Sequence, residues 1–340
     1  MVQRPRLTPA MADVRRAVRE NWDAAGVANG HLVLVACSGG ADSLALAAAA
    51  AFEGERAGIR VGAVIVEHGL QEATKRVAEQ TAVKLMALGL NPVSVVEVSV
   101  GGEGGLEAAA RDARYSALAN QALAHGAKAV MLGHTLNDQA ETVLLGLARG
   151  SGLRSIAGML PVTPAGAFLY LRPLLDVTRH TTEDFCRDSG LEFWVDPHNS
   201  NIDFTRVRLR AEALPALEAA LGPGVAQSLA RTAELAQHDL DYLEAASRDV
   251  FKSLAKLGPT AIVLPAAALQ DLHPAILGRV LHTAATTIGG QPTKASVDEI
   301  AQLVTNWHGQ KELTLPGVRV VRQGDDLTFK STKTLRPGAC

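Results

Sequence analysis

The stretch HLVLVACSGGADS, residues 31–43, decides the fold of this chain. Its first six residues form a short apolar run, which predicts a buried strand, and the Cys-Ser-Gly-Gly that follows predicts a loop. The Ala- and Leu-rich segment 43–57 predicts a helix. A strand, a glycine loop and a helix in this order allow loop amides and a helix N-terminus to face an anion.

Segments beyond this stretch continue the alternation of strands and helices. Apolar runs predict strands and longer segments predict helices: strands at 60–66, 93–100 and 128–132, and helices at 72–88, 106–124 and 137–147, the last with Asn137 as its cap. Alternation at this spacing implies right-handed crossovers and a parallel sheet with helices on both faces. The predicted fold class is therefore α/β for about the first 200 residues.

A polar, turn-rich break at 196–201 (DPHNSN) separates this region from a part with a different pattern. We expect helices at 204–221, 225–257 and 274–288, followed by a small hairpin around Gly324. The sequence thus predicts one domain at 1–200, which includes an N-terminal helix. A second, mainly helical domain at 201–340 ends in the hairpin and a basic tail.

The composition is that of an ordinary globular protein, with 340 residues, 47% hydrophobic and 20% charged. The net charge is −2, but residues 251–340 carry +4 against −6 for residues 1–250, which permits a polyanionic partner at a local patch. Three scattered cysteines do not make a disulfide framework. Because no apolar run reaches membrane-spanning length, we expect a soluble cytoplasmic protein without a membrane partner. A homodimer stays open as an alternative.

The glycine loop at 38–43 carries the sharpest chemical signal. Its glycines let backbone amides approach a phosphate, and the hydroxyls of Ser38 and Ser43 can add hydrogen bonds. A carboxylate at Asp42 is unfavourable inside an anion site unless a divalent cation bridges it to the phosphates. The alternative is a Gly-Gly turn with Asp42 capping the helix. The loop lacks the Gly-Lys-Ser/Thr end of a Walker motif.

Two further segments carry polar side chains at helical spacing. Glu107, Arg111, Arg114 and Tyr115 fall on one side of a predicted helix, either as an arginine fork near a phosphate or base, or as a surface ion pair. The segment 133–142 (GHTLNDQAET) begins at the carboxyl end of the fourth predicted strand, on the rim that holds the glycine loop. Its acidic residues either face a ligand or compensate the helix dipole.

The ordered set of motifs resembles the tRNA(Ile)-lysidine synthetases, a family of PP-loop ATP pyrophosphatases. The resemblance rests on SGGADS at 38–43, VEHGL at 66–70, the segments 107–115 and 133–142, RGSGL at 149–153, RPLL at 172–175, and DPHN at 196–199. It implies an enzyme that uses ATP to join L-lysine to C2 of the wobble cytidine of tRNA(Ile) with a CAU anticodon. The reaction passes through an adenylated cytidine, releases AMP and pyrophosphate, and changes codon reading from AUG to AUA.

The resemblance also assigns roles to individual residues. It implies catalytic roles for Asp42, Arg111, Arg114 and Asp138, with Mg²⁺ at Asp42. ATP binding falls to Ser38, Gly39, Gly40, Ala41, Asp42, Ser43, His68, Gly133 and His134. Lysine binding falls to Asn137, Asp138 and Glu141, and tRNA binding to Arg149, Arg154, Arg172, Arg206, Arg208 and Arg210. The chain departs from the family pattern at Glu67, where relatives often carry Asp, and at Val207, where they commonly carry Asn.

Three other functions fit parts of the sequence. A PP-loop enzyme that thiolates tRNA typically needs a Cys-x-x-Cys pair, and Cys37, Cys186 and Cys340 are not so spaced. An ammonia-using ligase usually needs a glutaminase portion, and no segment of the sequence predicts one. A nucleotide-sensing RNA-binding module without catalysis also remains open, and lysine-dependent release of pyrophosphate would distinguish it from the enzyme.

Overall fold

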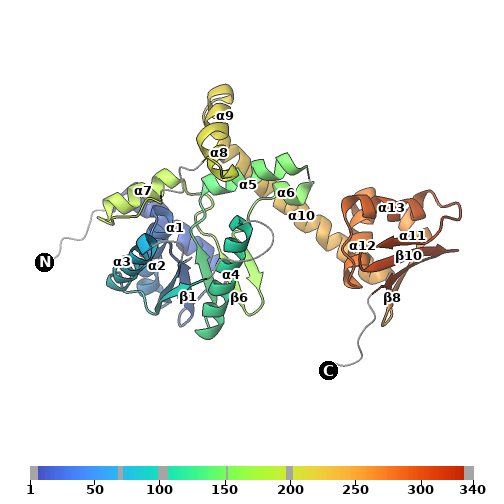
Figure 1. Cartoon of the computed structure of the whole chain (residues 1–340), viewed down its shortest axis with the longest axis horizontal. Coiled ribbons are helices and arrows are strands. Elements are labelled where there is room, and N and C mark those ends of the chain that lie inside the picture. Colours follow the sequence, from blue (N-terminus) through green and yellow to red (C-terminus); the bar gives the residue numbers. More distant parts are fainter. Residues whose placement is uncertain (1–6, 68–71, 99–105, 151, 197–201, 333–340) are drawn as a thin grey trace. The chain divides into compact units, whose positions relative to one another are not determined.

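The computed structural model describes residues 7–67, 72–98, 106–150, 152–196 and 202–332. It divides into two compact units, Met1–Gln237 and His238–Cys340 (Figure 1). None of the helices in the described ranges is long and apolar enough to cross a membrane. The predicted ATP-binding residue His68 lies outside the described residues, as does Cys340.

The first unit is built on a six-stranded sheet with the strand order β3-β2-β1-β4-β6-β5. Its strands are β1 (Leu32–Ala36), β2 (Arg60–Glu67), β3 (Val93–Glu97), β4 (Ala129–Leu132), β5 (Val162–Ala165) and β6 (Phe168–Leu171). Every neighbouring pair is parallel except β5 and β6, which form an antiparallel hairpin at one edge. The α/β fold class is therefore confirmed, although the sequence analysis missed β5 and β6.

Alternate residues of β1 face opposite sides of the sheet, as the period of a strand requires. Val33 and Val35 pack in one apolar cluster with α1 (Pro9–Ala24), α2 (Ala41–Ala57), α3 (Glu72–Ala87) and α7 (Arg179–Asp188). Leu32, Leu34 and Ala36 pack in a second cluster with α4 (Leu106–Ala124). Helices thus cover both faces, and β1 is buried along its whole length (Figure 1).

The order of the strands reverses between β1 and β4. The chain runs outward from β1 to β2 and β3, then returns through α4 to place β4 on the other side of β1. In open parallel sheets, a crevice for ligands opens at such a reversal, beyond the carboxyl ends of the strands. Here α2 follows β1 and α5 (Leu136–Arg149) follows β4, so the N-termini of both helices lie at this point.

The chain continues in this unit through α6 (Leu153–Ile156), the edge hairpin and α7, and then through three short helical segments. These are α8 (Thr205–Arg208), the π-helical turn η2 (Leu209–Ala213) and α9 (Leu214–Leu221), followed by α10 (Val225–Leu254). Leu214, Ala226 and Ala230 pack against Leu136 and Ala140 of α5. The compact unit therefore extends past residue 200, where the sequence predicts a domain boundary. That boundary stays a prediction.

The second unit holds a five-stranded antiparallel sheet with the order β7-β8-β11-β10-β9. Its elements are β7 (Lys256–Leu257), β8 (Ala261–Pro265), α11 (Ala266–Gln270), α12 (Pro274–Thr287), α13 (Lys294–Thr305), β9 (Leu313–Leu315), β10 (Val318–Gln323) and β11 (Asp326–Ser331). The predicted hairpin corresponds to β10 and β11. The sheet around it was not predicted, because β7 and β9 are only two and three residues long.

Candidate active site

The glycine loop between β1 and α2 is held closed by its own side chains. Gly39 adopts a positive φ of 84°, and a Cβ there would meet Thr81 Oγ1 at 2.6 Å. The Ser43 hydroxyl accepts a hydrogen bond from the Ser38 amide at 3.1 Å and donates to the Gly40 carbonyl at 3.0 Å. Ser43 is thus buried within the loop, whereas Ser38 is exposed. Of the two predicted phosphate-binding hydroxyls, the one on Ser38 is exposed to a ligand.

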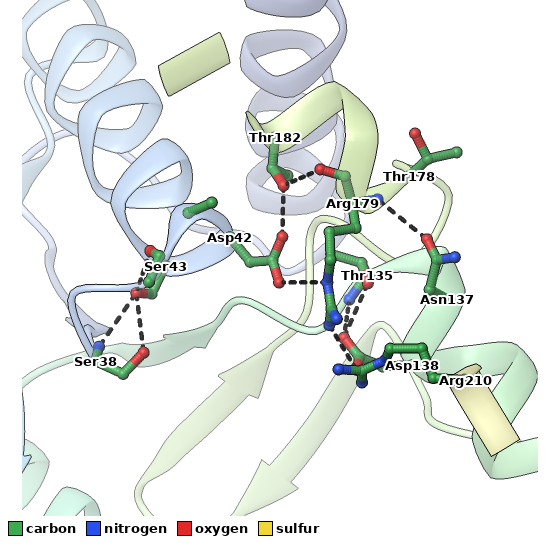
Figure 2. A network of polar contacts seen from close by, with 12 residues as sticks. Ser38, Asp42, Ser43, Thr135, Asn137, Asp138, Thr178, Arg179, Thr182 and Arg210 are labelled. Atoms are coloured by element: carbon green, nitrogen blue, oxygen red, sulfur yellow. Dashed lines mark hydrogen bonds and ion pairs between the residues drawn. The ribbon is translucent and has the colours of Figure 1, made fainter. Parts of the chain in front are cut away.

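Asp42 lies in the first turn of α2, but its carboxylate does not cap that helix. Its two oxygens contact α7: Oδ1 accepts from Thr182 Oγ1 at 2.5 Å, and Oδ2 accepts from Arg179 Nε at 3.3 Å (Figure 2). Burial raises the pKa of Asp42, and the charge of Arg179 and the Thr182 hydrogen bond oppose that rise. The capping interpretation of Asp42 is therefore not what the geometry shows.

The segment after β4 places Asp138 at the same edge of the sheet. Thr135, rather than the predicted Asn137, is the N-cap of α5, and Asp138 Oδ2 accepts from the Thr135 amide at 2.8 Å and its hydroxyl at 2.9 Å. The other oxygen, Oδ1, faces two guanidinium groups, Arg179 Nη2 at 3.4 Å and Arg210 Nη2 at 3.5 Å. One carboxylate thus serves the helix cap and also faces the site.

The pKa of Asp138 follows from these contacts. Burial opposes its ionisation, but the hydrogen bond from the Thr135 amide and the charge of Arg179 lower its pKa below the ordinary value. Asp138 is therefore a stable anion. A permanent negative charge at this position suits the recognition of a cation such as an ammonium group.

Glu141 lies one turn further along α5 and is completely buried. Its Oε1 accepts from Arg210 Nε at 2.7 Å, and its Oε2 lies 3.9 Å from Arg206 Nη1 and accepts no hydrogen bond from the residues that the structure describes. Burial raises the pKa of Glu141, and the hydrogen bond and charge of Arg210 oppose the rise. Glu141, like Asp42, is accordingly a carboxylate of this site that takes up a proton more readily than an exposed acid does.

Arg179, which the sequence analysis missed, joins the two predicted segments. It occupies the first position of α7 after the N-cap Thr178, and its backbone amide donates to Asn137 Oδ1 at 3.1 Å. Its guanidinium bridges Asp42 and Asp138 (Figure 2). The sequence does contain one signal for it. A cation in the first turn of a helix opposes the helix dipole, so an arginine there indicates acidic partners nearby.

Three of the arginines predicted to bind tRNA have other partners. Arg206 lies near Glu141 of α5, and Arg210 pairs with Glu141 and Asp138; the two arginines are four residues apart and share one side of the helical segment. Arg208 instead donates to the Ile202 and Asp203 carbonyls at 2.7 and 2.9 Å. tRNA binding by these residues stays a prediction.

Arg172 is also buried, and its Nη1 donates to the Leu160 carbonyl and to Thr163 Oγ1, each at 2.9 Å. These bonds tie the start of the edge hairpin to the end of β6. Arg149 and Arg154, in contrast, are exposed near the end of α5 and on α6. Of the six arginines assigned to tRNA, these two and Arg208 have the exposure that a phosphate contact requires.

Arg114 and Arg111 differ in how close they come to the glycine loop. Burial lowers the pKa of Arg114, whose guanidinium is within electrostatic range of His134 and of Cys37, the residue that precedes the loop. Arg114 therefore lies near the loop. Arg111 is exposed, and its guanidinium sits 5.3 Å from the centre of the Tyr115 ring on its own helix.

Gly133 and His134 bring the end of β4 against the loop. A Cβ on Gly133 would lie 3.2 Å from the Ser43 amide nitrogen and 3.3 Å from the Asp42 carbonyl, so a side chain there would press on the loop. Burial lowers the pKa of His134 to about 4, although the charge of Asp138 opposes the shift. His134 is therefore neutral at pH 7, and its Nδ1 makes no hydrogen bond with described residues.

The residues around Asp42 suit a magnesium ion that arrives with phosphates. Among the described residues, no group of three or more His, Cys, Asp and Glu side chains could hold a metal alone. Mg²⁺ is usually bound by one or two carboxylates together with water and substrate phosphates, so a full protein cage is unnecessary. Asp42, at a helix N-terminus beside the glycine loop, supplies such a carboxylate.

Comparisons with known proteins cover both units. A family model described as a PP-loop domain matches residues 12–217, and one described as the TilS substrate binding domain matches residues 264–328. A tRNA(Ile)-lysidine synthase of Streptomyces coelicolor is 50% identical over 311 residues, which cover 90% of this chain and 87% of the relative. A tRNA(Ile)-lysidine synthase of Thermobifida fusca is 50% identical over 315 residues, which cover 92% and 93%.

Among solved structures, the U34-tRNA thiolase NcsA from Methanococcus maripaludis is similar, with a TM-score of 0.58 and 18% identity. The match covers 67% of this chain and 80% of the thiolase. At this identity the likeness concerns the fold alone.

Proposed function

The chain belongs to the tRNA(Ile)-lysidine synthase family, and from this membership we propose how its residues perform the reaction. It is an ATP-dependent ligase, which joins L-lysine to C2 of the wobble cytidine of tRNA(Ile) and releases AMP and pyrophosphate. The assignment of roles rests on one observation, the placement of the carboxylates Asp42 and Asp138. These carboxylates stand at the N-termini of α2 and α5 and share Arg179.

In the first step, the glycine loop and the N-terminus of α2 hold the two outer phosphates of ATP. The cytidine O2 forms a bond to the α-phosphorus, and the bond from that phosphorus to the pyrophosphate oxygen breaks. A magnesium ion held by Asp42 would neutralise charge on the departing pyrophosphate. Arg114, which lies near the start of the loop, stabilises charge at the α-phosphate. The resulting adenylate turns a poor leaving oxygen into a good one.

In the second step, the ε-nitrogen of lysine forms a bond to C2, and AMP leaves with the oxygen. The attacking amine must first be neutral, and it loses a further proton after the attack. Asp138 binds the ammonium group, since its low pKa keeps it charged. Glu141 accepts the proton that the ammonium group loses before the attack, because burial raises its pKa and its Oε2 has no hydrogen bond among the described residues; the second proton leaves to solvent. The two acids on α5 thus divide binding and proton transfer.

Two single variants separate the two steps. We expect Asp42→Asn to lower pyrophosphate release by about 100-fold or more, because it removes an electrostatic contact at the reacting phosphates. We expect Asp138→Asn to retain tRNA adenylation, followed with α-labelled ATP, but to lose incorporation of labelled lysine. Asp184→Asn is the matched control, since Asp184 lies on α7 and pairs with Arg187 at the surface. Undiminished pyrophosphate release by Asp42→Asn would contradict the assignment of that residue.

The cysteines of the site do not favour thiolation. Cys37 and Cys186 are free and buried. Burial raises the pKa of both thiols, that of Cys186 to about 12, so neither is a ready thiolate.

A further inference from the structure

The guanidinium of Arg179 lies between two carboxylates that serve different substrates in the function proposed above. Its Nε is 3.3 Å from Asp42 Oδ2 on the ATP side, and its Nη2 is 3.4 Å from Asp138 Oδ1 on the lysine side (Figure 2). The side chain is 28% exposed, so a ligand entering the site can reach it. Arg179 is thus the one described cation with an ion pair to each of these two acids.

The protein's own arginines occupy the cation positions of the site when no substrate is bound. Asp42 pairs with Arg179, Asp138 pairs with Arg179 and Arg210, and Glu141 pairs with Arg210. A lysine ammonium group that approaches Asp138 therefore competes with guanidinium groups already in place. Binding of lysine gains little while those contacts persist, because one cation only replaces another.

An anionic substrate changes this balance. A guanidinium prefers the oxygens of a phosphate, with which it makes paired, charge-assisted hydrogen bonds. Both contacts of Arg179 in the site are long, at 3.3 and 3.4 Å, and its backbone is held separately by Asn137. The side chain can therefore turn toward phosphates at the glycine loop while α7 keeps its place.

We propose that Arg179 couples the two substrate sites by acting as a resident cation that ATP draws away from Asp138, so that ATP binding raises the affinity for lysine. The proposal rests on the function proposed above. Coupling between two sites is reciprocal, so lysine must raise the affinity for ATP by the same factor. Lysine therefore binds best to the nucleotide-bound protein, because the lysine site becomes fully anionic only when a nucleotide is present.

Isothermal titration calorimetry on the full chain tests this. The ligands are L-lysine and the magnesium complex of AMPCPP, an ATP analogue in which a methylene replaces the oxygen between the α- and β-phosphates. For the wild-type protein we expect AMPCPP to raise the affinity for lysine about tenfold, within the usual range of coupling between sites. Lysine must raise the affinity for AMPCPP equally. Independent binding of the two ligands to the wild type would overturn the proposal without any variant.

Variants of Arg179 test the residue itself. We expect Arg179→Met to bind lysine without nucleotide as tightly as the wild type does with AMPCPP, and to show no coupling. We expect Arg179→Lys to keep part of the coupling, since lysine retains the positive charge but not the paired N–H donors of a guanidinium. Arg187→Met is the matched control, because Arg187 lies on the same helix with its side chain 68% exposed. Coupling that persists in a folded Arg179→Met protein, or weaker lysine binding with and without AMPCPP, would contradict the proposal.

Asp138→Asn distinguishes a failure of this proposal from a failure of the proposed function. If Asp138→Asn binds lysine as the wild type does, the lysine site itself is misassigned and both proposals fail. If Asp138→Asn loses lysine binding while Arg179→Met keeps the coupling, only the role of Arg179 is wrong.

Discussion

Arg210 places its Nε 2.7 Å from Oε1 of Glu141, a carboxylate without exposed surface. The pair joins the π-helical turn η2 to α5, and Arg206 lies 3.9 Å from the second oxygen of the same carboxylate. π-helical turns are rare and frequently occur at functional sites, and this one carries Arg210 to a buried acid. The relationship has consequences for stability as well as for catalysis.

Removing Arg210 should leave a buried charge without its main partner. We expect Arg210→Met to lower the free energy of unfolding by about 3 kcal/mol, the scale seen when one member of a buried pair is removed. In the Glu141→Gln background the same substitution should cost much less, because the buried group is then neutral. Urea unfolding of both single variants and the double variant measures this coupling. Additive losses would show that Arg210 and Glu141 do not interact energetically.

The half-buried, neutral His134 should make stability depend on pH. Its pKa in the folded protein is about 4, below the ordinary value of 6.5, so between these values the unfolded chain binds more protons. The stabilising contribution of neutral His134 is present above pH 6.5 and is lost as the pH falls toward 4.

The measurement is the difference between His134→Asn and the wild type. Asp42 and Glu141 also titrate at low pH, but they are common to both proteins. We expect the variant to lose less stability than the wild type between pH 6.5 and 4, measured by urea unfolding. His125→Asn is the control, since His125 is exposed. Identical pH profiles for His134→Asn and the wild type would contradict the prediction.

A methyl group on Gly133 should disturb ATP binding more than folding. The new Cβ would lie 3.2 Å from the Ser43 amide nitrogen and 3.3 Å from the Asp42 carbonyl, so the loop backbone must shift by a few tenths of an ångström. We expect Gly133→Ala to raise the KM for ATP about tenfold, since small displacements of positioning groups are costly.

Gly278→Ala is the matched control for that substitution. Gly278 lies on α12 of the second unit, and a Cβ added there would make an ordinary van der Waals contact with Val297 at 3.8 Å. We expect it to leave the KM for ATP unchanged and to stabilise α12 by roughly 0.5–1 kcal/mol. A KM for ATP in Gly133→Ala equal to that of the wild type would show that the loop tolerates the contact.

Four of the six arginines predicted to bind tRNA should separate into two groups. Arg149 and Arg154 are exposed, and we expect alanine at either position to reduce the salt slope of tRNA binding by about one. Arg206 and Arg210 face Glu141, so alanine there should lower lysine incorporation and leave the salt slope nearly unchanged. Filter-binding titrations across salt concentrations measure the slopes. A flattened slope for Arg210→Ala would place that residue in the tRNA interface.

The part of the site that follows β1 and β4 was predictable from the sequence, because its signals are local. An apolar run followed by glycines indicated the loop at 38–43, and acidic residues after the next central strand indicated the segment at 133–142. Strand periodicity and crossover rules then place both at one edge of the sheet. No local pattern shows that Arg179 bridges them, since that contact joins residues 137 positions apart.

Other features escaped prediction for physical reasons. The edge hairpin of β5 and β6 has only four residues in each strand, with Pro164 and Gly166 within it, and these residues usually indicate a loop. Arg206, Arg208 and Arg210 were assigned to tRNA together, although ordinary helical spacing already puts Arg206 and Arg210 on one side and Arg208 on another. The π-helical turn that begins after Arg208 was not predicted either, because its residues, LRAEA, are ordinary helix formers that do not signal such a turn.

The closed glycine loop has a consequence for how a nucleotide is received. Ser43 ties the loop from within, and the Trp194 amide donates to the Gly39 carbonyl at 2.9 Å from outside. The backbone of this segment therefore loses its conformational freedom when the chain folds, and not when ATP binds. The phosphates meet a preorganised cradle, so the conformational adjustment on binding falls to side chains at the rim.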